Sequence, residues 1–510
     1  VGVDNGVGGI NINVISDFSN RAGSGADYYL MALGYHDRAP NIKTGGYALW
    51  SGTSFSAPTI TGAVALLAQA FPNLKGADIV SILFQSADDL GAPGTDAIYG
   101  HGRLNLARAF QPIGATSMAD SQQPVSTSYN GGLPGAAGDA GAQGSLGAVI
   151  LDGYSRAFVL NLARTLREAP KDRPLTRALQ TDVQVASAAA GPVSVAMTVS
   201  QRHGLRGFEL ERLGIGPEDA RRARLVAGSA VARLGDKTAV AFGFAEGAKA
   251  MERRLNGAEA GAFLIARDVV GEPGFAAKRN GSMAFRQEFA GTGITFSGET
   301  GSVWQDQDDR TNAFGSPYRW ANVALDRRFG SSWVSAGIGR LEEKQTLLGG
   351  RMGNALGGGG SKTLFLDVEG RHDFGNGWSA ALTARHGWTD FAAGKFQTSA
   401  YGFDLTKSAL FSDNDKLGLR LSQPLRVESG GFAMLLPTAY DYATLTATTS
   451  LSRFSLTPSG RELDAELSYG SSILDGNGWI GGNLFARRQP GHIADEKNDI
   501  GAAVRLALTF

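Results

Sequence analysis

Apolar and polar residues alternate with a period of two over most of the chain from about residue 182 to the end. In the stretch KTLFLDVEGRHDFGNGWSAALTARHGW, Leu364, Leu366 and Val368 fall on one face of an extended chain, whereas Asp367 and Glu369 fall on the other. Successive side chains of a β-strand point to opposite faces, so this pattern predicts strands with one apolar and one charged face. Tight Gly turns followed by Trp, in RRFGSSW, HDFGNGW and LDGNGW, predict hairpins between such strands.

The two faces of the predicted strands favour a membrane barrel over a sandwich. The polar face carries full charges of both signs on strand after strand, which a water-filled lumen tolerates. The apolar face carries aromatic residues near the strand ends, as the interfaces of a bilayer require. These aromatic residues are Trp378, Trp388, Tyr469 and Trp479. We therefore expect lipid to be faced by Leu364, Leu366, Val368, Leu382 and Leu467, and the lumen by Asp367, Glu369, Arg385 and Glu466. A soluble β-domain is the alternative.

The chain ends on a further alternating segment, AAVRLALTF, whose apolar stripe consists of Val504, Leu506, Leu508 and Phe510. A C-terminal strand that finishes on Phe resembles the closing strand and assembly signal of bacterial outer-membrane barrels. About twelve strand-like segments follow residue 280, and most are long enough to cross a bilayer at a tilt. The fold predicted for residues 280–510 is thus an antiparallel transmembrane β-barrel of about twelve strands.

The chain before residue 280 divides into four parts by sequence pattern. Residues 1–111 have an α/β pattern, with apolar residues at helical spacing in GAVALLAQAF and ADIVSILFQSA. Residues 112–148 are rich in Gly, Ala, Ser and Pro, which predicts a linker. Residues 149–180 are predicted to form a helix, a candidate plug for the barrel lumen. Residues 181–279 are either a β-rich extension or the first strands of the barrel, and the pattern leaves both open.

Composition removes several classes of function. Lys+Arg and Asp+Glu both number 48, so the formal net charge is zero and no nucleic-acid partner is expected. The absence of Cys excludes disulfides and thiolate metal sites, and we expect no cofactor and no bound metal. The first residues, VGVDNGVGGI, contain no Met, basic region or signal-like apolar run. We therefore expect them to belong to the middle of a folded domain, in a fragment that is missing its front.

The stretch SGTSFSAPTITGAVALLAQAFPNL places small polar residues directly before an apolar helix. The hydroxyl of Ser54 would lie near the positive end of the helix dipole and beside unpaired N–H groups, which can bind a developing oxyanion. The alternative is that Ser54 is only the N-cap of the helix, because Ser and Thr are common there.

The segment GTSFSAP resembles the serine motif of the subtilisin-like serine proteases, the subtilases. The resemblance covers residues 1–111, which look like the C-terminal portion of the catalytic domain: DFSNRAG is similar to a subtilase turn, and YGHGRLNLARAF to the closing segment. It implies that Ser54 is the nucleophile of a serine endopeptidase and that Gly52 keeps the backbone open to a polypeptide substrate. Thr53 would pack beside the nucleophile, and Pro58 would lie in the first turn of the helix, where its missing N–H costs little.

The partners that Ser54 needs are harder to find. A serine is a weak nucleophile without a base within hydrogen-bond reach and an acid that orients the base. In subtilases the chain order is Asp, His, Ser, so both partners should precede Ser54. His36 lies upstream but lacks the family's context, His101 follows the serine, and Asp4 and Asp17 lack the context of the triad acid. We therefore expect the triad Asp and His to be absent and the chain as given to be inactive.

A subtilase segment followed by a linker, a helix and a barrel that ends in Phe resembles a serine-protease autotransporter. This resemblance implies a barrel in the bacterial outer membrane, with the protease at the cell surface or secreted. The partners it implies are a polypeptide substrate, outer-membrane lipid and the barrel-assembly machinery. Two alternatives stay open. One is an outer-membrane pore or displayed module that carries a degenerate protease remnant, and the other is a soluble protease with a β-sandwich tail.

Overall fold

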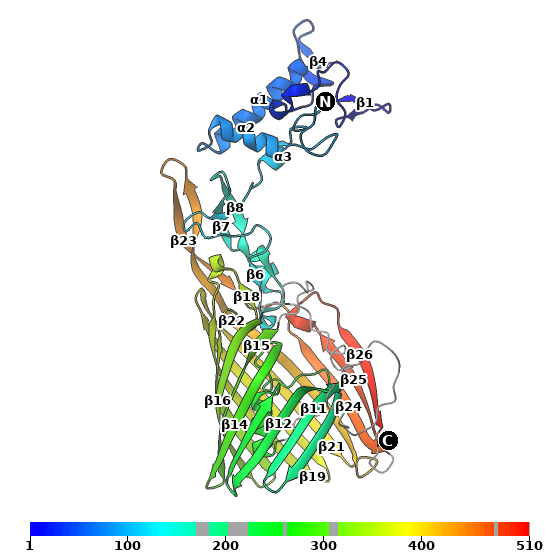
Figure 1. The fold of residues 1–510 in the computed structure, drawn as a ribbon, viewed down its shortest axis with the longest axis vertical. Coiled ribbons are helices and arrows are strands. Elements are labelled where there is room, and N and C mark those ends of the chain that lie inside the picture. Colours follow the sequence, from blue (N-terminus) through cyan, green and yellow to red (C-terminus); the bar gives the residue numbers. More distant parts are fainter. Residues whose placement is uncertain (170–182, 202–222, 259–262, 305–314, 474–477, 509–510) are drawn as a thin grey trace. The chain divides into compact units, whose positions relative to one another are not determined.

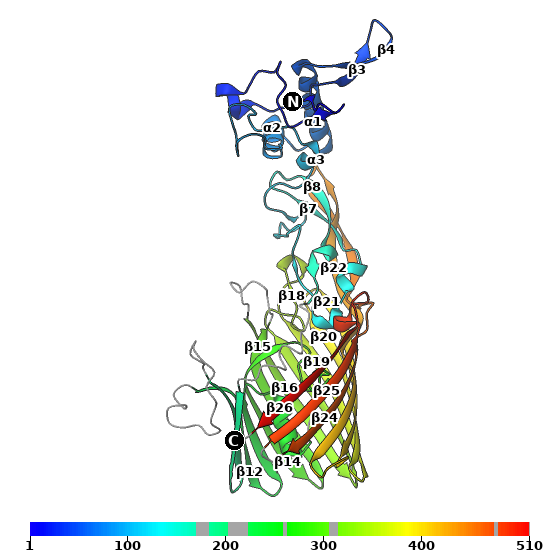
Figure 2. The same ribbon diagram turned by 90° about the vertical axis from the view of Figure 1, so that its right-hand side faces the viewer.

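The computed structural model describes residues 1–169, 183–201, 223–258, 263–304, 315–473 and 478–508. The chain divides into two compact units (Figures 1 and 2). The first unit comprises Val1–Thr127, Gly147–Leu160 and Leu435–Ser450, and the second comprises Ser128–Leu146, Asn161–Met434 and Leu451–Phe510. Within the described part of the chain, no helix combines the length and the apolar character that crossing a membrane requires.

The helices of the first unit enclose an apolar core. They are α1 (Thr53–Ala70), α2 (Gly76–Gln85) and α3 (Leu106–Ala109). Leu67 of α1, Ile82 of α2 and Ala109 of α3 are fully buried in one cluster. The helices predicted from GAVALLAQAF and ADIVSILFQSA are confirmed by α1 and α2. The elements that precede them are β1 (Val3–Asp4), β2 (Ile10–Asn11), η1 (Gly23–Tyr28), β3 (Asp37–Asn41) and β4 (Gly46–Trp50).

The helix predicted over residues 149–180 is wrong for the part that the structure describes. Strands β5 (Ser117–Met118), β7 (Gly147–Leu151) and β8 (Ala157–Asn161) form a small sheet in the order β5-β7-β8. The Asp152 carboxylate accepts the N–H groups of Tyr154 (2.9 Å) and Arg156 (3.0 Å), which closes the turn between β7 and β8. An Asp-Gly turn between runs of β-branched and aromatic residues is a hairpin pattern. Residues 170–180 lie outside the described residues.

The linker predicted over residues 112–148 is packed into short elements. They include β6 (Gly131–Gly132), η2 (Gly135–Ala137) and α4 (Ala140–Gln143). Strand β6 pairs with β18 (Arg351–Met352) and with β9 (Leu166–Arg167), which follows η3 (Leu162–Thr165). A Cβ on Gly131 would lie 2.4 Å from the Arg351 carbonyl oxygen. Small residues therefore serve close packing of backbones in this segment instead of flexibility.

The second unit is dominated by an antiparallel sheet with 16 strands among the described residues. Figures 1 and 2 show these strands tilted side by side in a sheet that curls round one of its faces. Strands β10 and β26 are the ends of the sheet, and no pairing joins them within the described ranges. The strands are β10 (Val183–Ala190), β11 (Val193–Gln201), β12 (Ala223–Gly235), β13 (Thr238–Phe244), β14 (Ala277–Phe289), β15 (Thr292–Trp304), β16 (Gly315–Phe329), β17 (Ser332–Glu343), β19 (Ser361–Gly375), β20 (Trp378–Phe391), β21 (Gly394–Ser408), β22 (Asp415–Asp441), β23 (Thr446–Ser455), β24 (Leu463–Ile473), β25 (Gly478–Arg488) and β26 (Asp499–Leu508).

The sheet has more strands than the about twelve expected, because β10–β13 pair into it ahead of residue 280. Sequences such as VQVASAAA in β10 are rich in Ala, so their alternation of apolar and charged residues is weak. Short 3-10 turns, η4 (Asn354–Leu356) and η6 (Pro490–His492), lie in connections between the later strands.

The prediction of the two faces is confirmed for the residues that carry it. Leu366 is 39% exposed, whereas its neighbour Asp367 is 4% exposed and Glu369 is 1% exposed. The same division holds for the other residues named above, since Leu364, Val368, Leu382 and Leu467 are exposed and Arg385 and Glu466 are buried. Val504 and Leu506 on β26 are exposed too, while the side chains of Leu508 and Phe510 lie outside the description. The charged face of the sheet is thus the inner face, and the apolar face is the outer face.

A segment between β13 and β14 lies against the inner face. We call it the inner segment; its described residues are 245–258 and 263–276, and it contains α7 (Ala248–Asn256). Lys249 and Arg253 of α7 form ion pairs with Glu369 of β19, at 2.5 and 3.1 Å. The Glu466 carboxylate of β24 accepts backbone N–H groups from residues 264, 265 and 266 at 2.7–2.8 Å. These inward charges therefore bind protein groups of the inner segment directly.

Candidate active site

Ser54 is the second residue of α1, and it is exposed. Gly52 is the N-cap, so the assignment of Ser54 as an N-cap is wrong. The Phe55 N–H donates to the Gly52 carbonyl at 3.0 Å, and no side chain caps the helix. The first N–H groups of a helix lack intrahelical acceptors and carry the positive end of its dipole. The hydroxyl of Ser54 therefore lies where a developing negative charge would be stabilised.

The backbone leading into α1 is held by a close glycine contact. The Gly52 N–H donates to the Gly34 carbonyl at 2.7 Å, and the Ser56 hydroxyl donates to the Ala32 carbonyl at 3.1 Å. A Cβ on Gly34 would lie 2.3 Å from the Ser56 Oγ and 2.7 Å from the Gly52 carbonyl oxygen. Any larger residue at position 34 would displace the start of α1, and the Ser54 backbone with it.

Pro58 lies deeper in α1 than the sequence suggested. The helix begins at Thr53, so Pro58 falls in the second turn instead of the first. A Pro there removes the N–H that would donate to the carbonyl four residues earlier, which belongs to Ser54. The Thr59 and Thr61 hydroxyls donate back to the carbonyls of residues 55 and 57, both at 3.0 Å, and so reinforce this turn.

The histidines of the first unit are engaged elsewhere. His36 stacks on Tyr35, with ring centroids 4.2 Å apart. His101 stacks on Phe84 at 4.1 Å, and its ring nitrogens contact the Asp27 carbonyl (3.0 Å) and the Thr95 hydroxyl (3.4 Å). Among the described residues, no hydrogen bond joins Ser54 to a histidine, and no group of His, Asp and Glu could hold a metal ion. Within the described ranges, neither His36 nor His101 is therefore hydrogen-bonded to Ser54.

Asp88 joins α2 to α3, a contact that the sequence did not reveal. Its carboxylate accepts hydrogen bonds from Arg103 (2.5 Å), Asn105 (2.7 Å) and Arg108 (3.4 Å). Burial raises the pKa of Asp88, but the hydrogen bonds from Asn105 and Arg103 outweigh burial, so the pKa lies below its usual value. These partners belong to the closing segment that carries the family resemblance, which gives that segment a structural role.

Arg156 is the second residue that sequence reasoning missed. Its side chain is fully buried and pairs with Asp152 at 2.7 Å. The guanidinium also donates to the carbonyls of Ala109 (2.5 Å) and Gln111 (2.9 Å), at and just beyond the end of α3, and lies over the Phe71 ring at 5.1 Å. It thereby satisfies carbonyl groups that α3 leaves without intrahelical donors. In the sequence, the spacing of Asp152 and Arg156 across an Asp-Gly turn could have indicated this ion pair.

Parts of this chain are similar to known proteins. The sequence model of the subtilase family matches residues 6–102. Fervidolysin of Fervidobacterium pennivorans is 36% identical over 104 residues, which are 20% of this chain and 15% of that protein. An extracellular serine protease of Serratia marcescens is 44% identical over 65 residues, 13% of this chain and 6% of its own. The autotransporter lipoprotein NalP of Neisseria meningitidis serogroup B is 42% identical over 60 residues, 12% of this chain and 6% of its own.

The chain thus spans 15% or less of the length of each of these relatives. Two solved structures, one of them of an outer membrane protein, also resemble it. A loop-deletion mutant of OmpT from Vibrio cholerae matches 63% of this chain and 89% of its own length at 10% identity, with a TM-score of 0.37. OprB of Pseudomonas putida matches 62% of this chain and 81% of its own length at 13% identity, with a TM-score of 0.35.

Proposed function

We propose that this chain, whose residues 6–102 are a segment of the subtilase family, is part of a subtilisin-type serine endopeptidase that its own outer-membrane barrel displays or secretes. The observation that carries the proposal is the exposed Ser54 at the start of α1, within the segment that the family model matches. In this proposal Ser54 is the nucleophile of the endopeptidase, and Gly52, Thr53 and Pro58 support the position of Ser54. The substrate is a polypeptide.

The outer face of the sheet supports the membrane part of this proposal. Exposed apolar side chains alternate with buried residues along β16, β17 and β19, and on β19 the buried residues include the charged Asp367 and Glu369. A surface of this kind would be costly in water but suits the hydrocarbon region of a bilayer. In the proposal, β10 and β26 close the barrel, outer-membrane lipid surrounds it, and the barrel-assembly machinery inserts it, because an open edge in lipid would leave backbone groups unsatisfied.

The catalytic base and acid are proposed to come from residues outside these 510, since no histidine of the described chain contacts Ser54. The same observation favours the second candidate, a barrel that displays an inactive remnant of a protease. The two candidates differ in whether a longer polypeptide from the same gene makes Ser54 reactive.

A phosphonate probe that labels activated serines tests this difference. We expect no labelling of the 510-residue chain, because a serine without a base is a weak nucleophile. A longer polypeptide that includes the sequence upstream of Val1 should be labelled at Ser54 and should lose both labelling and peptide hydrolysis in Ser54→Ala. Ser51→Ala is the matched control and should keep both.

Rapid stoichiometric labelling of Ser54 in the 510-residue chain would contradict the expectation that Ser54 lacks a catalytic base there. Absence of labelling in a folded longer polypeptide would favour the inactive remnant.

A further inference from the structure

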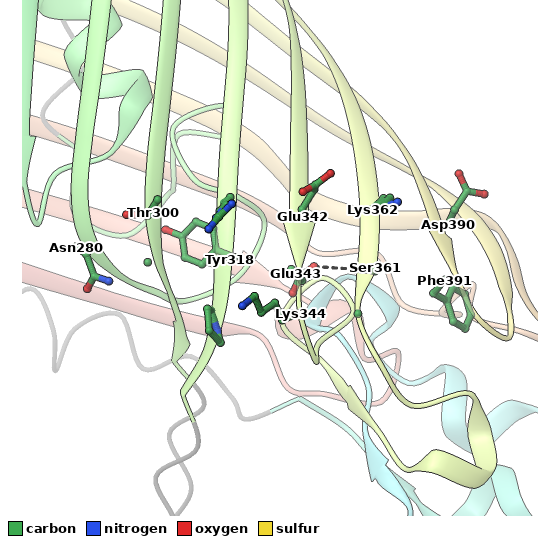
Figure 3. Close-up of a pocket in the computed structure, with 14 residues that line it drawn as sticks. Asn280, Thr300, Tyr318, Glu342, Glu343, Lys344, Ser361, Lys362, Asp390 and Phe391 are labelled. Atoms are coloured by element: carbon green, nitrogen blue, oxygen red, sulfur yellow. Dashed lines mark hydrogen bonds between the residues drawn. The ribbon is translucent and has the colours of Figure 1, made fainter.

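A row of charged residues crosses the outer face near one end of the sheet. Arg319 of β16 pairs in register with Glu342 of β17, Glu342 with Lys362 of β19, Lys362 with Asp390 of β20, and Asp390 with Lys395 of β21. Figure 3 shows Glu342, Lys362 and Asp390 on neighbouring strands, with the hydrogen bond between Ser361 and Glu343 beside them. We call these five residues, from Arg319 to Lys395, the charged row.

The charged row lies where the outer face changes character. On the same face, Leu364 is the next residue after Lys362 on β19, and Trp388 is the next to Asp390 on β20. Both are exposed. Ile338 and Val323 continue the apolar surface on β17 and β16, at 58% and 43% exposure. Any membrane that covered this apolar surface would therefore meet its headgroups at the charged row.

Basic side chains outnumber acidic ones around the row. The exposed basic residues there are Lys278, Arg319, Arg340, Lys344, Lys362 and Lys395, and the carboxylates on the same face are Glu342 and Asp390. Glu342 already pairs with Arg340 at 2.6 Å. The neighbouring Glu343 does not change this balance, because it is buried and accepts the N–H groups of residues 348 and 349.

A cavity of about 850 Å³ opens among these side chains. Its charged lining consists of three basic residues, Arg319, Lys344 and Lys362, and three carboxylates, Glu342, Glu343 and Asp390. Asn280 and Thr300 add neutral polar groups (Figure 3). Because Glu342 is paired with Arg340 and Glu343 is buried, a ligand held here would meet an excess of basic side chains and, beside them, the apolar outer face. An amphiphile with an anionic headgroup has this distribution of charge and apolar surface.

We propose that the cavity at the charged row binds the headgroup of a phosphate-bearing lipid, whose acyl chains then lie along the outer face beside Leu364 and Ile338. The inference rests on the proposed function, because it needs the outer face to be in a membrane. Arg319 and Lys362 donate charge-assisted hydrogen bonds to the phosphate oxygens. Asn280 and Thr300 hydrogen-bond the remaining polar part of the headgroup.

The test uses the full 510-residue chain folded in neutral detergent micelles. Native mass spectrometry would count bound phosphatidic acid and, separately, phosphatidylcholine with the same acyl chains. We expect the chain to prefer phosphatidic acid, and Arg319→Gln with Lys362→Gln to reduce that preference by about tenfold or more. The matched control, Arg327→Gln with Lys416→Gln, removes exposed basic residues near the other ends of β16 and β22 and should keep the preference.

Each outcome decides a separate point. The proposed lipid site would be wrong if the double variant at Arg319 and Lys362 kept the preference for phosphatidic acid. It would also be wrong if the control variant lost as much of that preference as the double variant. Displacement of the lipid by excess inorganic phosphate would assign the cavity to the free anion instead. Heat-modifiable gel mobility checks that each variant is folded. Its absence in the unaltered chain would count against the barrel, and therefore against the proposed function, independently of lipid binding.

Discussion

Glu369 shows how a single inward charge is held. Its carboxylate is 1% exposed and lies between Lys249 and Arg253 of the inner segment. Removing one partner of a buried ion pair is costly, because the other charges stay buried without compensation. Arg385 repeats this arrangement, since it pairs with Asp367 at 2.7 Å and donates to the Val270 carbonyl of the inner segment at 3.0 Å.

Glu369→Gln should therefore lower the free energy of unfolding by about 3–5 kcal/mol. Denaturant unfolding in detergent measures this loss. Adding Lys249→Met to the variant should restore part of the stability, because it removes one of the unpaired cations. A variant as stable as the unaltered chain would mean that water, rather than the inner segment, surrounds this carboxylate.

Leu366→Arg tests the outer face of the same strand, β19. In lipid, an Arg near the midplane should lower the stability of the refolded protein by about 2–4 kcal/mol, measured by reversible unfolding in vesicles. Leu366→Val is the control and should cost far less. A soluble β-domain would tolerate Arg at a residue that is 39% exposed, so a negligible effect in both variants would support that alternative.

At the scale of elements, α2 and α3 are linked through Asp88, whose pKa is lowered in the folded state. A carboxyl with a lowered folded pKa adds stability above its unfolded pKa, about 3.9, and loses it as the pH falls through the folded value. Asp88→Asn should therefore weaken the decline in stability of the first unit below about pH 4. Thermal unfolding from pH 7 to pH 2 measures this, with Asp27→Asn, an exposed aspartate of the same unit, as control. Equal acid sensitivity in Asp88→Asn and the unaltered chain would contradict the assignment.

The elements differ in how far their sequence predicts them. Strands such as β19 were predictable, because one face is apolar and the other charged, so the period of two is unambiguous. The hairpin of β7 and β8 was not, since a short apolar run such as GAVIL fits either a helix or a strand, and the turn at Asp152 decides between them. The place of Ser54 at the start of a helix was predictable from local sequence, and its role as nucleophile stays a prediction. The buried contacts of Arg156 depend on the distant α3 and could not be read from one segment.

At the scale of the whole molecule, the apolar stripe of β26 raises the question whether it serves stability alone or assembly as well. Val504 and Leu506 are exposed on β26, and the sequence continues this apolar stripe to Phe510. Deleting Phe510 should impair insertion in cells more than it lowers the stability of refolded protein, if the assembly machinery reads the terminal aromatic residue. As one lipid-facing side chain, Phe510 would contribute about 1.5–3 kcal/mol in both settings.

Heat-modifiable mobility of the outer-membrane fraction, beside the same assay on refolded protein, separates these cases. Normal insertion of the Phe510 deletion would argue against an assembly signal. A soluble periplasmic product from the unaltered sequence would argue against the barrel.

The position of the inner segment between β13 and β14 has a consequence for the order of events. Its partners Glu369 and Glu466 belong to β19 and β24, so its binding site exists only after strands far along the chain have come together. Pulsed hydrogen exchange should therefore show the backbone amides of residues 264–266 gaining protection after those of β19, and simultaneous protection would contradict this order. If the protease leaves the cell through the space inside the sheet, the inner segment cannot occupy that space at the same time. The inner segment would then close the space only after the protease has passed through it.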